Sequence, residues 1–310
     1  MSQMTRVGVI GAGRVGAVFA AALRASSTVE RHEIVAVAAE STLSRSRAHT
    51  LLPGVPICKP TEVARRSDLL LLTVPDDMLA NVANMLVGAG AIKRGTRVVH
   101  TSGRHGLGAI DVVRTVGAHP MAVHPAMTFT GTEVDLGRLQ GCVFGVTVDD
   151  ADRDEAADLV KTLGGSPMWV AESNRTLYHA GMAHGANHLV TLVAQSMDLL
   201  ARAGAADPAS TLRPLLTAAL DNALSQGDAA LTGPIVRGDV NTVRAHVTDI
   251  LDSAPDTLPS YIALARATAD RAVMDGRLLP IRASAISSVL DSAMAEFAAR
   301  HRQRFGAGAS

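Results

Sequence analysis

The sequence predicts two domains: an α/β domain with a mostly parallel sheet over residues 1–172, and an all-α domain over residues 173–310. Up to Glu172, short apolar runs rich in β-branched residues alternate with helical patterns. This alternation requires right-handed crossovers and therefore mostly parallel strands. After Glu172 the strand pattern stops and only helical patterns follow, which places the domain boundary there.

Seven short runs have the composition of strands. The third is apolar on both faces, as expected of a central strand in a parallel sheet. The strands are predicted at residues 6–10, 33–39, 68–74, 97–100, 118–123, 143–148 and 168–170. Helical patterns between them predict helices at residues 15–25, 76–87, 107–115 and 152–163.

The C-terminal domain contains five helical patterns, at residues 173–202, 211–226, 240–251, 255–274 and 282–300. Gly204 has the position of a C-terminal cap for the first of them. Asp207 and Pro208 then provide an N-cap and a proline in the first turn of the next helix. Asp239 is predicted to cap the helix that begins at Val240.

Composition excludes several classes of protein. The 29 basic and 29 acidic residues balance, and one Trp, two Tyr and five Phe offer few groups for base stacking, which argues against nucleic-acid binding. Cys58 and Cys142 form neither a disulfide framework nor a cysteine metal site. No uncharged apolar run reaches membrane-spanning length. We therefore expect a soluble, cytoplasmic protein that binds neither membrane nor nucleic acid.

A glycine-rich turn follows the first predicted strand and opens a helix. Its residues are Gly11, Ala12, Gly13, Arg14, Val15 and Gly16. In this context a GxGxxG turn is typical of a Rossmann-like, dinucleotide-binding domain. The first glycine permits the tight turn, the second lets the backbone approach a pyrophosphate, and the third lets the helix pack on the strand. The alternative is a glycine-rich turn that binds no ligand.

The residues after the second strand bear on the choice of dinucleotide. Ser41, Arg45 and Arg47 favour the 2′-phosphate of NADP, because hydroxyl and guanidinium groups donate hydrogen bonds to phosphate. Glu40 could instead hold the ribose 2′-hydroxyl of NAD, although it lies further from the glycine turn than the usual spacing of about 20 residues. NADP is therefore the predicted cofactor and NAD the alternative. The two arginines could also form only a solvated helix face.

Unusual residues stand where three of the predicted strands end. They are Val74, Pro75, Thr101, Ser102 and His124. In open parallel sheets ligands bind beyond the carboxyl ends of the strands, so these residues are predicted to line one crevice. Alternatively, Pro75 only ends a strand and Ser102 only belongs to a turn. Because proline follows both His119 and His124 and forces extended backbone, we expect both imidazoles on loops.

The first helix of the C-terminal domain carries a catalytic candidate. A spacing of four places His179, Ala183 and Asn187 on one face. A lone helical histidine is usually structural, and His179 becomes a candidate because it falls at the domain junction. His184 and His188 are also four residues apart, but no third ligand stands beside them, so no metal site is predicted.

Taken together, the motifs have a family resemblance. They are the glycine turn at 11–16, Val74-Pro75-Asp76, His100-Thr101-Ser102-Gly103, His124-Pro125-Ala126-Met127-Thr128-Phe129, Tyr178-His179, Asn187 and the segment 231–239. The set resembles a bacterial family that pairs a Rossmann-like NADP-binding domain with a C-terminal helical domain of long-unknown function. Some members are similar to an alternative type of ketopantoate reductase, an enzyme of pantothenate biosynthesis, and wider relatives are the β-hydroxyacid and prephenate dehydrogenases. The resemblance implies a nicotinamide cofactor, a small acid substrate and a homodimer built on the helical domains.

One departure from the wider relatives concerns the proton donor. Relatives of the hydroxyacid dehydrogenase type carry a catalytic lysine on the first long helix of the second domain, followed by an asparagine. Here Asn187 is present, but Lys161 is the last lysine of the chain and precedes that helix. His179 is the predicted substitute, since an unperturbed histidine pKa of about 6.5 suits proton transfer at neutral pH.

These residues predict an NADPH-dependent reductase of a small 2-keto acid, with ketopantoate as the leading substrate. His179, or failing it His124, would protonate the forming alkoxide. Asn187 and Ser102 would orient the carbonyl, and Arg237 would bind the substrate carboxylate through a bidentate pair. The alternatives are a prephenate- or pyrroline-carboxylate-type dehydrogenase, or an NADP-binding sensor without turnover. For Arg237 the alternative is an ordinary salt bridge.

Overall fold

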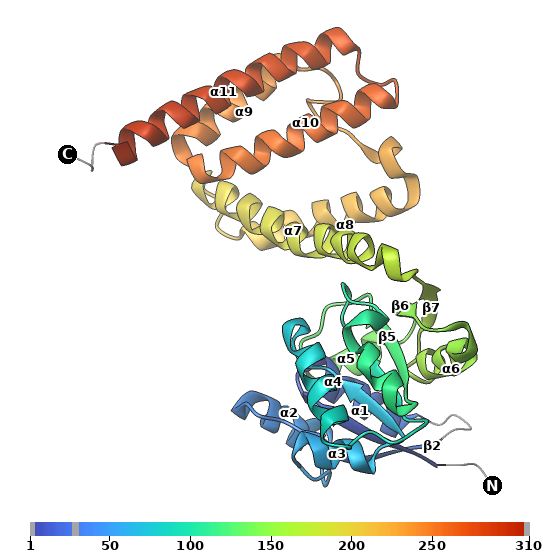
Figure 1. Cartoon of the computed structure of the whole chain (residues 1–310). Coiled ribbons are helices and arrows are strands. Elements are labelled where there is room, and N and C mark those ends of the chain that lie inside the picture. The colour runs from blue at the N-terminus through green and yellow to red at the C-terminus, as the bar shows by residue number, and fades with distance from the viewer. Residues whose placement is uncertain (1–3, 27–30, 307–310) are drawn as a thin grey trace. The chain divides into compact units, whose positions relative to one another are not determined.

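The computed structural model describes residues 4–26 and 31–306, and the chain divides into two compact units, residues 1–186 and 187–310 (Figure 1). The division falls inside helix α7 (Arg175–Arg202), later than the boundary expected after residue 172. The first turns of α7 pack against the sheet, and the side chain of Arg175 is only 1% exposed. The start of a helix therefore belongs to the α/β unit.

The first unit is built on a sheet of seven strands in the order β2-β1-β3-β4-β5-β6-β7. The strands are β1 (Met4–Ile10), β2 (Arg31–Ala38), β3 (Leu69–Leu72), β4 (Arg97–His100), β5 (His119–Pro125), β6 (Val143–Thr147) and β7 (Ser166–Trp169). Strands β1 to β5 are parallel, β6 is antiparallel to β5, and β7 is parallel to β6. The predicted Rossmann-like, mostly parallel sheet is confirmed. Its strand order changes direction between β1 and β3, where ligands bind in open α/β sheets.

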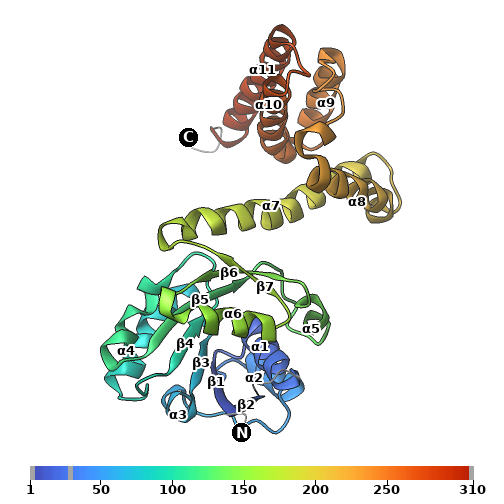
Figure 2. The same ribbon diagram turned by 90° about the vertical axis from the view of Figure 1, so that its right-hand side faces the viewer.

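Helices cover both faces of the sheet, so its central strand is buried on both sides (Figure 2). Helices α1 (Arg14–Ala25), α2 (Thr42–Leu51) and α6 (Arg153–Thr162) pack with Leu69 and Leu71. Helices α3 (Pro60–Arg66) and α4 (Leu79–Gly88) and the 3₁₀ helix η2 (Leu107–Val116) pack with Leu70 and Leu72. Successive leucines of β3 therefore point into two different apolar cores, one on each face of the sheet.

Several helices of the first unit differ from the prediction. The sequence pattern missed α2, α3 and α5 (Val134–Arg138), because α2 is mostly polar and the other two are short. The helix predicted at 107–115 is a 3₁₀ segment with a kink at Ile110, whose φ of −127° is not helical. Long 3₁₀ segments have poorer hydrogen-bond geometry than α-helices and need anchoring by their surroundings.

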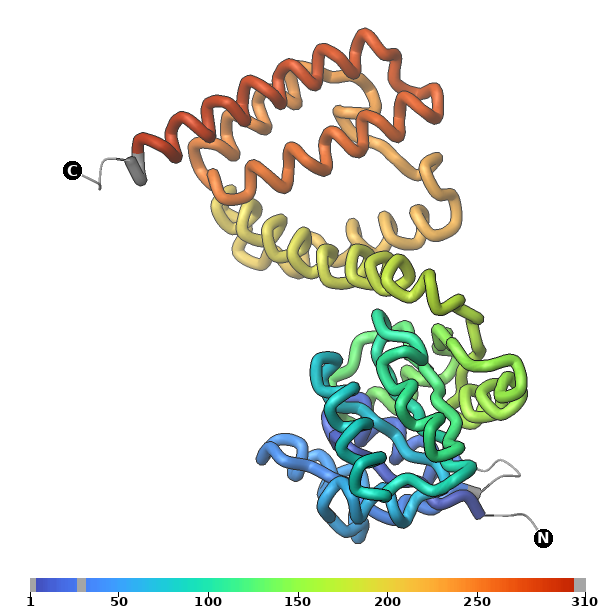
Figure 3. Tube along the Cα trace, viewed as in Figure 1, coloured from blue at the N-terminus to red at the C-terminus, as the bar shows by residue number. Residues whose placement is uncertain are grey.

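The second unit is entirely helical, as predicted. It contains the rest of α7 together with α8 (Pro208–Gln226), α9 (Val240–Ser253), α10 (Leu258–Met274) and α11 (Pro280–Gly306). Helix α11 packs against both α9 and α10, and the tube in Figure 3 shows α10 and α11 side by side. The caps are as predicted, because Asp207 accepts from Ser210 N–H and Asp239 accepts from Thr242 N–H. Among the described helices, none is long and apolar enough to cross a membrane.

The two-sided burial of β3 can be tested by shortening one leucine on each face. Leu70→Ala and Leu71→Ala should each lower the free energy of unfolding by about 2–5 kcal/mol, because each leaves a cavity in a different core. Leu43→Ala is the control, since this leucine is 68% exposed on α2 and its loss should cost less than about 0.5 kcal/mol. Denaturant unfolding gives all three values. A loss at only one of the two core positions would contradict the two-layer arrangement.

Candidate active site

The glycine turn between β1 and α1 contains two glycines that the fold itself requires. Gly11 has a φ of +96°, and a Cβ there would lie 2.7 Å from the carbonyl oxygen of Thr73. A Cβ on Gly16 would lie 2.2 Å from Oγ1 of Thr73 and 2.4 Å from the carbonyl oxygen of Gly11. The turn is thereby closed against the end of β3, and the Thr73 hydroxyl donates a hydrogen bond of 2.6 Å to the Gly11 carbonyl.

Gly13 is different, because neither the backbone nor the packing of the chain requires a glycine there. Its φ of −74° suits any residue, and the nearest atom to a Cβ would be the Gly11 carbonyl oxygen at 3.9 Å. Gly13 is also the N-cap of α1, where unpaired backbone N–H groups attract anions. An open backbone at a helix N-terminus fits a pyrophosphate group, with Ala12, Arg14 and Val15 beside it.

The residues after β2, which the sequence analysis treated together as candidates for binding the dinucleotide, differ in their structural roles. Ser41 is the N-cap of α2, since its Oγ accepts the Ser44 N–H at 3.1 Å. Arg45 and Glu40 are exposed. Arg47 and Arg14 both contact Gly131. A Cβ on Gly131 would stand 2.7 Å from Arg47 Nε and 2.9 Å from Arg14 Cγ. Two guanidinium-bearing side chains, one from the glycine turn and one from α2, thus meet on the Gly131 loop.

Ser102 lies in the loop after β4, where its hydroxyl is already engaged. Its Oγ donates to Asp76 Oδ2 at 2.8 Å and accepts the N–H of His105 at 3.1 Å. Asp76 follows Val74 and Pro75 at the end of β3, so the structure brings the ends of β3 and β4 together as predicted. Because its hydroxyl hydrogen bonds Asp76, Ser102 is better placed to fix the loop than to donate to a ligand.

His100, the last residue of β4, forms hydrogen bonds with the same loop. Its ring is fully buried, with Nε2 lying 2.9 Å from the Gly106 carbonyl and Nδ1 accepting from Ser102 N–H at 3.3 Å. A carbonyl only accepts, so the hydrogen is on Nε2 and the ring is neutral. Burial lowers the pKa of His100 to about 4, which keeps the ring uncharged at neutral pH.

His124 lies within β5 and not on a loop, contrary to the prediction for it and for His119. The proline after each histidine does impose extended backbone, and a β-strand satisfies that requirement as well as a loop does. His119 stands at the opposite end of β5, 3.0 Å from Asp152, and takes no part in the cluster at the strand ends.

Two histidines meet over Gly103. The ring centroids of His124 and His179 lie 6.2 Å apart with the rings edge to face. A Cβ on Gly103 would stand 2.5 Å from His179 Cδ2 and 3.0 Å from His124 Nε2. Burial, followed by the charge of Arg175 and the interaction with His179, lowers the pKa of His124 to about 4. The structure therefore places both predicted proton donors at one point, with His124 neutral.

Arg175, the first residue of α7, is a site residue that the sequence analysis missed. It is buried, and it donates to three backbone carbonyls: Nε to His105 at 2.9 Å, and the two terminal nitrogens to Gly145 and Ser102 at 3.0 Å each. An arginine at a helix start carries no distinctive sequence signal. Its guanidinium ties α7 to the Ser102 loop and to β6.

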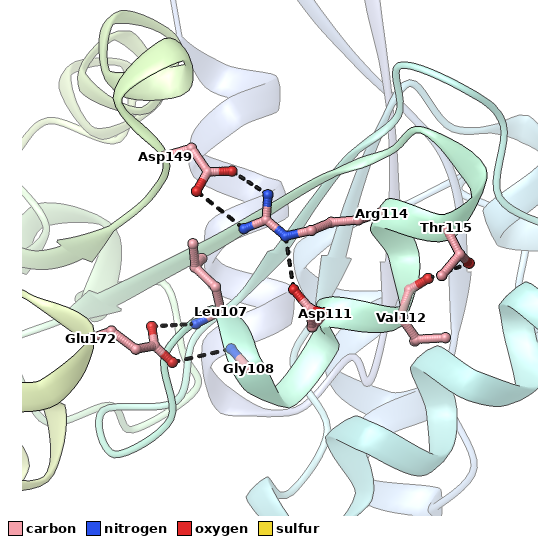
Figure 4. Close-up of polar contacts among 8 residues, drawn as sticks. All are labelled: Leu107, Gly108, Asp111, Val112, Arg114, Thr115, Asp149 and Glu172. Atoms are coloured by element: carbon pink, nitrogen blue, oxygen red, sulfur yellow. Dashed lines mark hydrogen bonds and ion pairs between the residues drawn. The ribbon is translucent and has the colours of Figure 1, made fainter.

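A second set of polar contacts anchors the segment after this loop (Figure 4). The Glu172 carboxylate accepts the N–H groups of Leu107 at 2.8 Å and Gly108 at 3.1 Å, which caps the start of η2. Further along η2, Arg114 binds Asp149 and donates to Asp111 at 2.8 Å. These contacts explain how a 3₁₀ segment persists beside the site.

Two predicted site residues belong to the second unit. Asn187 begins that unit, and Arg237 precedes the N-cap of α9; both are exposed. Their predicted roles toward a substrate remain predictions. Among the described residues, no group of three or more His, Cys, Asp or Glu side chains could hold a metal ion.

Comparisons with known families match both parts of the chain. Residues 2–125 match a Rossmann-like domain, and residues 142–268 match a domain of unknown function, DUF2520. Among curated proteins, none matches the sequence.

Solved structures share the fold at low sequence identity. A candidate NADP oxidoreductase from Bacteroides fragilis is 21% identical, with a TM-score of 0.71 over 86% of this chain and 98% of that one. A protein from Thermotoga maritima is 19% identical, with a TM-score of 0.65 over 87% and 99% of the two chains. Pyrroline carboxylate reductase from Plasmodium falciparum, solved with NADP bound, is 12% identical, with a TM-score of 0.56 over 89% and 98%. At these identities the similarity is one of fold.

The burial of His100 makes stability depend on pH in a defined direction. Its pKa falls from the usual histidine value of 6.5 to about 4 on folding, so the unfolded chain binds a proton where the folded protein does not. The free energy of unfolding should therefore decrease as the pH falls from about 6.5 toward 4, and His124 should add to this effect.

His100→Gln should make this decrease shallower between about pH 7 and about pH 5, above most carboxyl titrations. Urea denaturation across that range measures it. His49→Gln, which changes an exposed histidine on α2, is the control and should leave the pH dependence as in the wild type. Equal pH dependence in the wild type and His100→Gln would contradict a buried neutral imidazole.

Proposed function

Because the chain joins a Rossmann-like domain to a DUF2520 domain, as its motifs predict, we propose that it is a nicotinamide-dependent oxidoreductase that reduces a small 2-keto acid. The observation that carries the proposal is the contrast within the glycine turn. Gly11 and Gly16 are explained by the packing of the chain, whereas packing does not require a glycine at position 13, where the open backbone suits a ligand that approaches it.

NADP is the proposed cofactor. Arg14 and Arg47 converge on the Gly131 loop, and guanidinium groups suit a phosphate dianion. Ser41, whose Oγ already caps α2, contributes less than the sequence suggested. NAD is the alternative, with Glu40 exposed after β2 and able to accept a hydrogen bond from a ribose hydroxyl.

The proposed chemistry is reduction of a ketone to an alcohol. When bound, the nicotinamide supplies the hydride that adds to the carbonyl carbon, and the carbonyl oxygen then takes a proton. His179 is the proposed donor of that proton, because it contacts Gly103 beside the strand ends, whereas His124 is held neutral. Asn187 and Arg237 are proposed to orient the carbonyl and to bind the substrate carboxylate.

Ketopantoate is the leading substrate, on the strength of the family resemblance. Pyrroline carboxylate is the main rival, since a reductase that carries this name and was solved with NADP bound shares the fold over most of both chains. A prephenate-type dehydrogenase is a further alternative. An NADP-binding sensor would show cofactor binding without turnover.

We also propose that the second unit forms a homodimer. Several large apolar side chains on the later part of α7 and on α8 are exposed: Leu189, Val190, Leu215, Leu220 and Leu224. Burial of such side chains against a second copy would stabilise the helices that carry them.

Cofactor binding should stabilise the fold, and more with NADPH than with NADH. At about 100 times the Kd, binding adds about 2.7 kcal/mol to the free energy of unfolding, which raises the Tm. Gly13→Ala should keep the Tm of the free protein, because its Cβ meets only one atom at 3.9 Å, but should lose the rise with NADPH.

Gly16→Ala is the matched control for that experiment. Its Cβ would overlap Thr73, so it should lower the Tm even without cofactor. Differential scanning fluorimetry measures the Tm of the wild type and of both variants, without cofactor, with NADPH and with NADH. A larger rise with NADH would transfer the assignment to NAD and Glu40, and a rise that survives Gly13→Ala would place the cofactor elsewhere.

Turnover should depend on His179. A panel of small 2-keto acids, including ketopantoate, with NADPH oxidation as the readout, identifies the substrate. His179→Ala should then lower kcat by about 10²- to 10⁴-fold, the usual contribution of a general acid, with the NADPH-induced rise in Tm preserved.

His184→Ala, on the same helix and exposed, is the control and should leave kcat close to the wild-type value. A His179→Ala protein that is less stable but still active would assign His179 a structural role. No turnover on any acid, together with normal NADPH binding, would favour the sensor.

A further inference from the structure

Tyr178 occupies a position that only a glycine on the neighbouring strand allows. A Cβ on Gly145 would stand 2.5 Å from Tyr178 Cζ and 2.6 Å from its Oη, so the phenol lies directly on the backbone of β6. Gly145 is the register partner of His124 across the β5–β6 pair. Tyr178, in the first turn of α7, therefore contacts the residue that pairs with His124, and its phenol lies beside the His124 ring.

The direction of the hydrogen bond between Tyr178 and His124 follows from the groups around the phenol. Its Oη lies 2.8 Å from His124 Nδ1. A phenol carries one hydrogen, and Nδ1 is the acceptor in reach for it within the described part of the chain. His124 Nδ1 is then the acceptor, so a neutral His124 carries its hydrogen on Nε2.

His124 is also held in the neutral state. Burial disfavours its charged form, and the charge of Arg175 acts in the same direction, as do interactions with His179 and His100, while Asp76 opposes them. The remaining titratable neighbour, Tyr178, has a pKa raised by burial and keeps its hydrogen at neutral pH. The result is a neutral imidazole with a single N–H.

That N–H lies on the side of the ring that faces the cluster at the strand ends. Nε2 is the ring atom nearest to Gly103, at 3.0 Å from the position of a Cβ there, and His179 contacts the same glycine. A neutral imidazole can polarise a carbonyl by donating a hydrogen bond, without giving up its proton.

We propose that Tyr178 is a positioning residue that holds His124 as the Nε2–H tautomer, so that His124 donates a hydrogen bond to the substrate carbonyl while His179 supplies the proton. This inference rests on the proposed reduction. It divides between two histidines the roles that the sequence analysis treated as alternatives.

The tautomer is measured without substrate or cofactor. In the full-length protein labelled with ¹⁵N-histidine, the two-bond NMR pattern distinguishes an unprotonated Nδ1 from a protonated one, and His124→Gln assigns the signal. We expect unprotonated Nδ1 in the wild type and a mixture of tautomers in Tyr178→Phe. A protonated Nδ1 in the wild type would overturn the proposal, whether or not any keto acid is reduced.

Tyr261→Phe is a matched control, because this second tyrosine of the chain lies 2.9 Å from Nδ1 of His246 in the other unit. It should alter the His246 signal and leave that of His124 unchanged. In turnover, Tyr178→Phe should lower kcat by about three- to tenfold, the range of one lost hydrogen bond, with KM for NADPH unchanged.

Tyr261→Phe should leave kcat unchanged. Melting temperatures of both variants check that each is folded. A wild-type kcat in Tyr178→Phe, with the tautomer altered, would remove His124 from the reaction while leaving the proposed reductase intact.

Discussion

One buried guanidinium fixes the backbone on which the candidate site is built. Arg175 donates to the carbonyls of Ser102, His105 and Gly145, two in the loop after β4 and one in β6. Without it, three buried or half-buried carbonyls would lose a charge-assisted partner, and each such loss costs about 1–3 kcal/mol. The same residue begins α7, so the loop, the sheet and the helix that carries His179 take their relative positions from a single side chain.

Glycines then decide how closely the side chains approach that backbone. A methyl group on Gly103 would overlap His179, and one on Gly145 would overlap the phenol of Tyr178. These glycines allow aromatic rings to touch the strand ends directly. Within the glycine turn, Gly13 differs from Gly11 and Gly16, because a Cβ there would meet only the Gly11 carbonyl oxygen, at 3.9 Å. The glycines beside the strand ends therefore admit the protein's own rings, whereas Gly13 leaves the backbone of the turn open.

The sequence predicted features that depend on local pattern and missed those that depend on distant partners. The leucines of β3 show burial on both faces by composition alone, and the glycine turn is recognisable from its place between a strand and a helix. Helix α2 is mostly polar and has no apolar period to detect, and η2 depends on Glu172, which lies more than sixty residues away. The role of Arg175 requires three carbonyls from two segments to converge, which no spacing in the sequence encodes.

Electrostatics connects this scaffold to the proposed reduction. A reductase of an anionic acid needs a lasting positive charge and a proton that can leave, and a single imidazolium loses the first when it gives up the second. A guanidinium keeps its charge at every pH at which the protein is folded. Arg175 thereby disfavours protonation of His124, which leaves that ring as a fixed hydrogen-bond donor. In the proposed reaction the transferable proton is assigned to His179, so that the fixed charge, the fixed N–H and the mobile proton would reside on three different side chains.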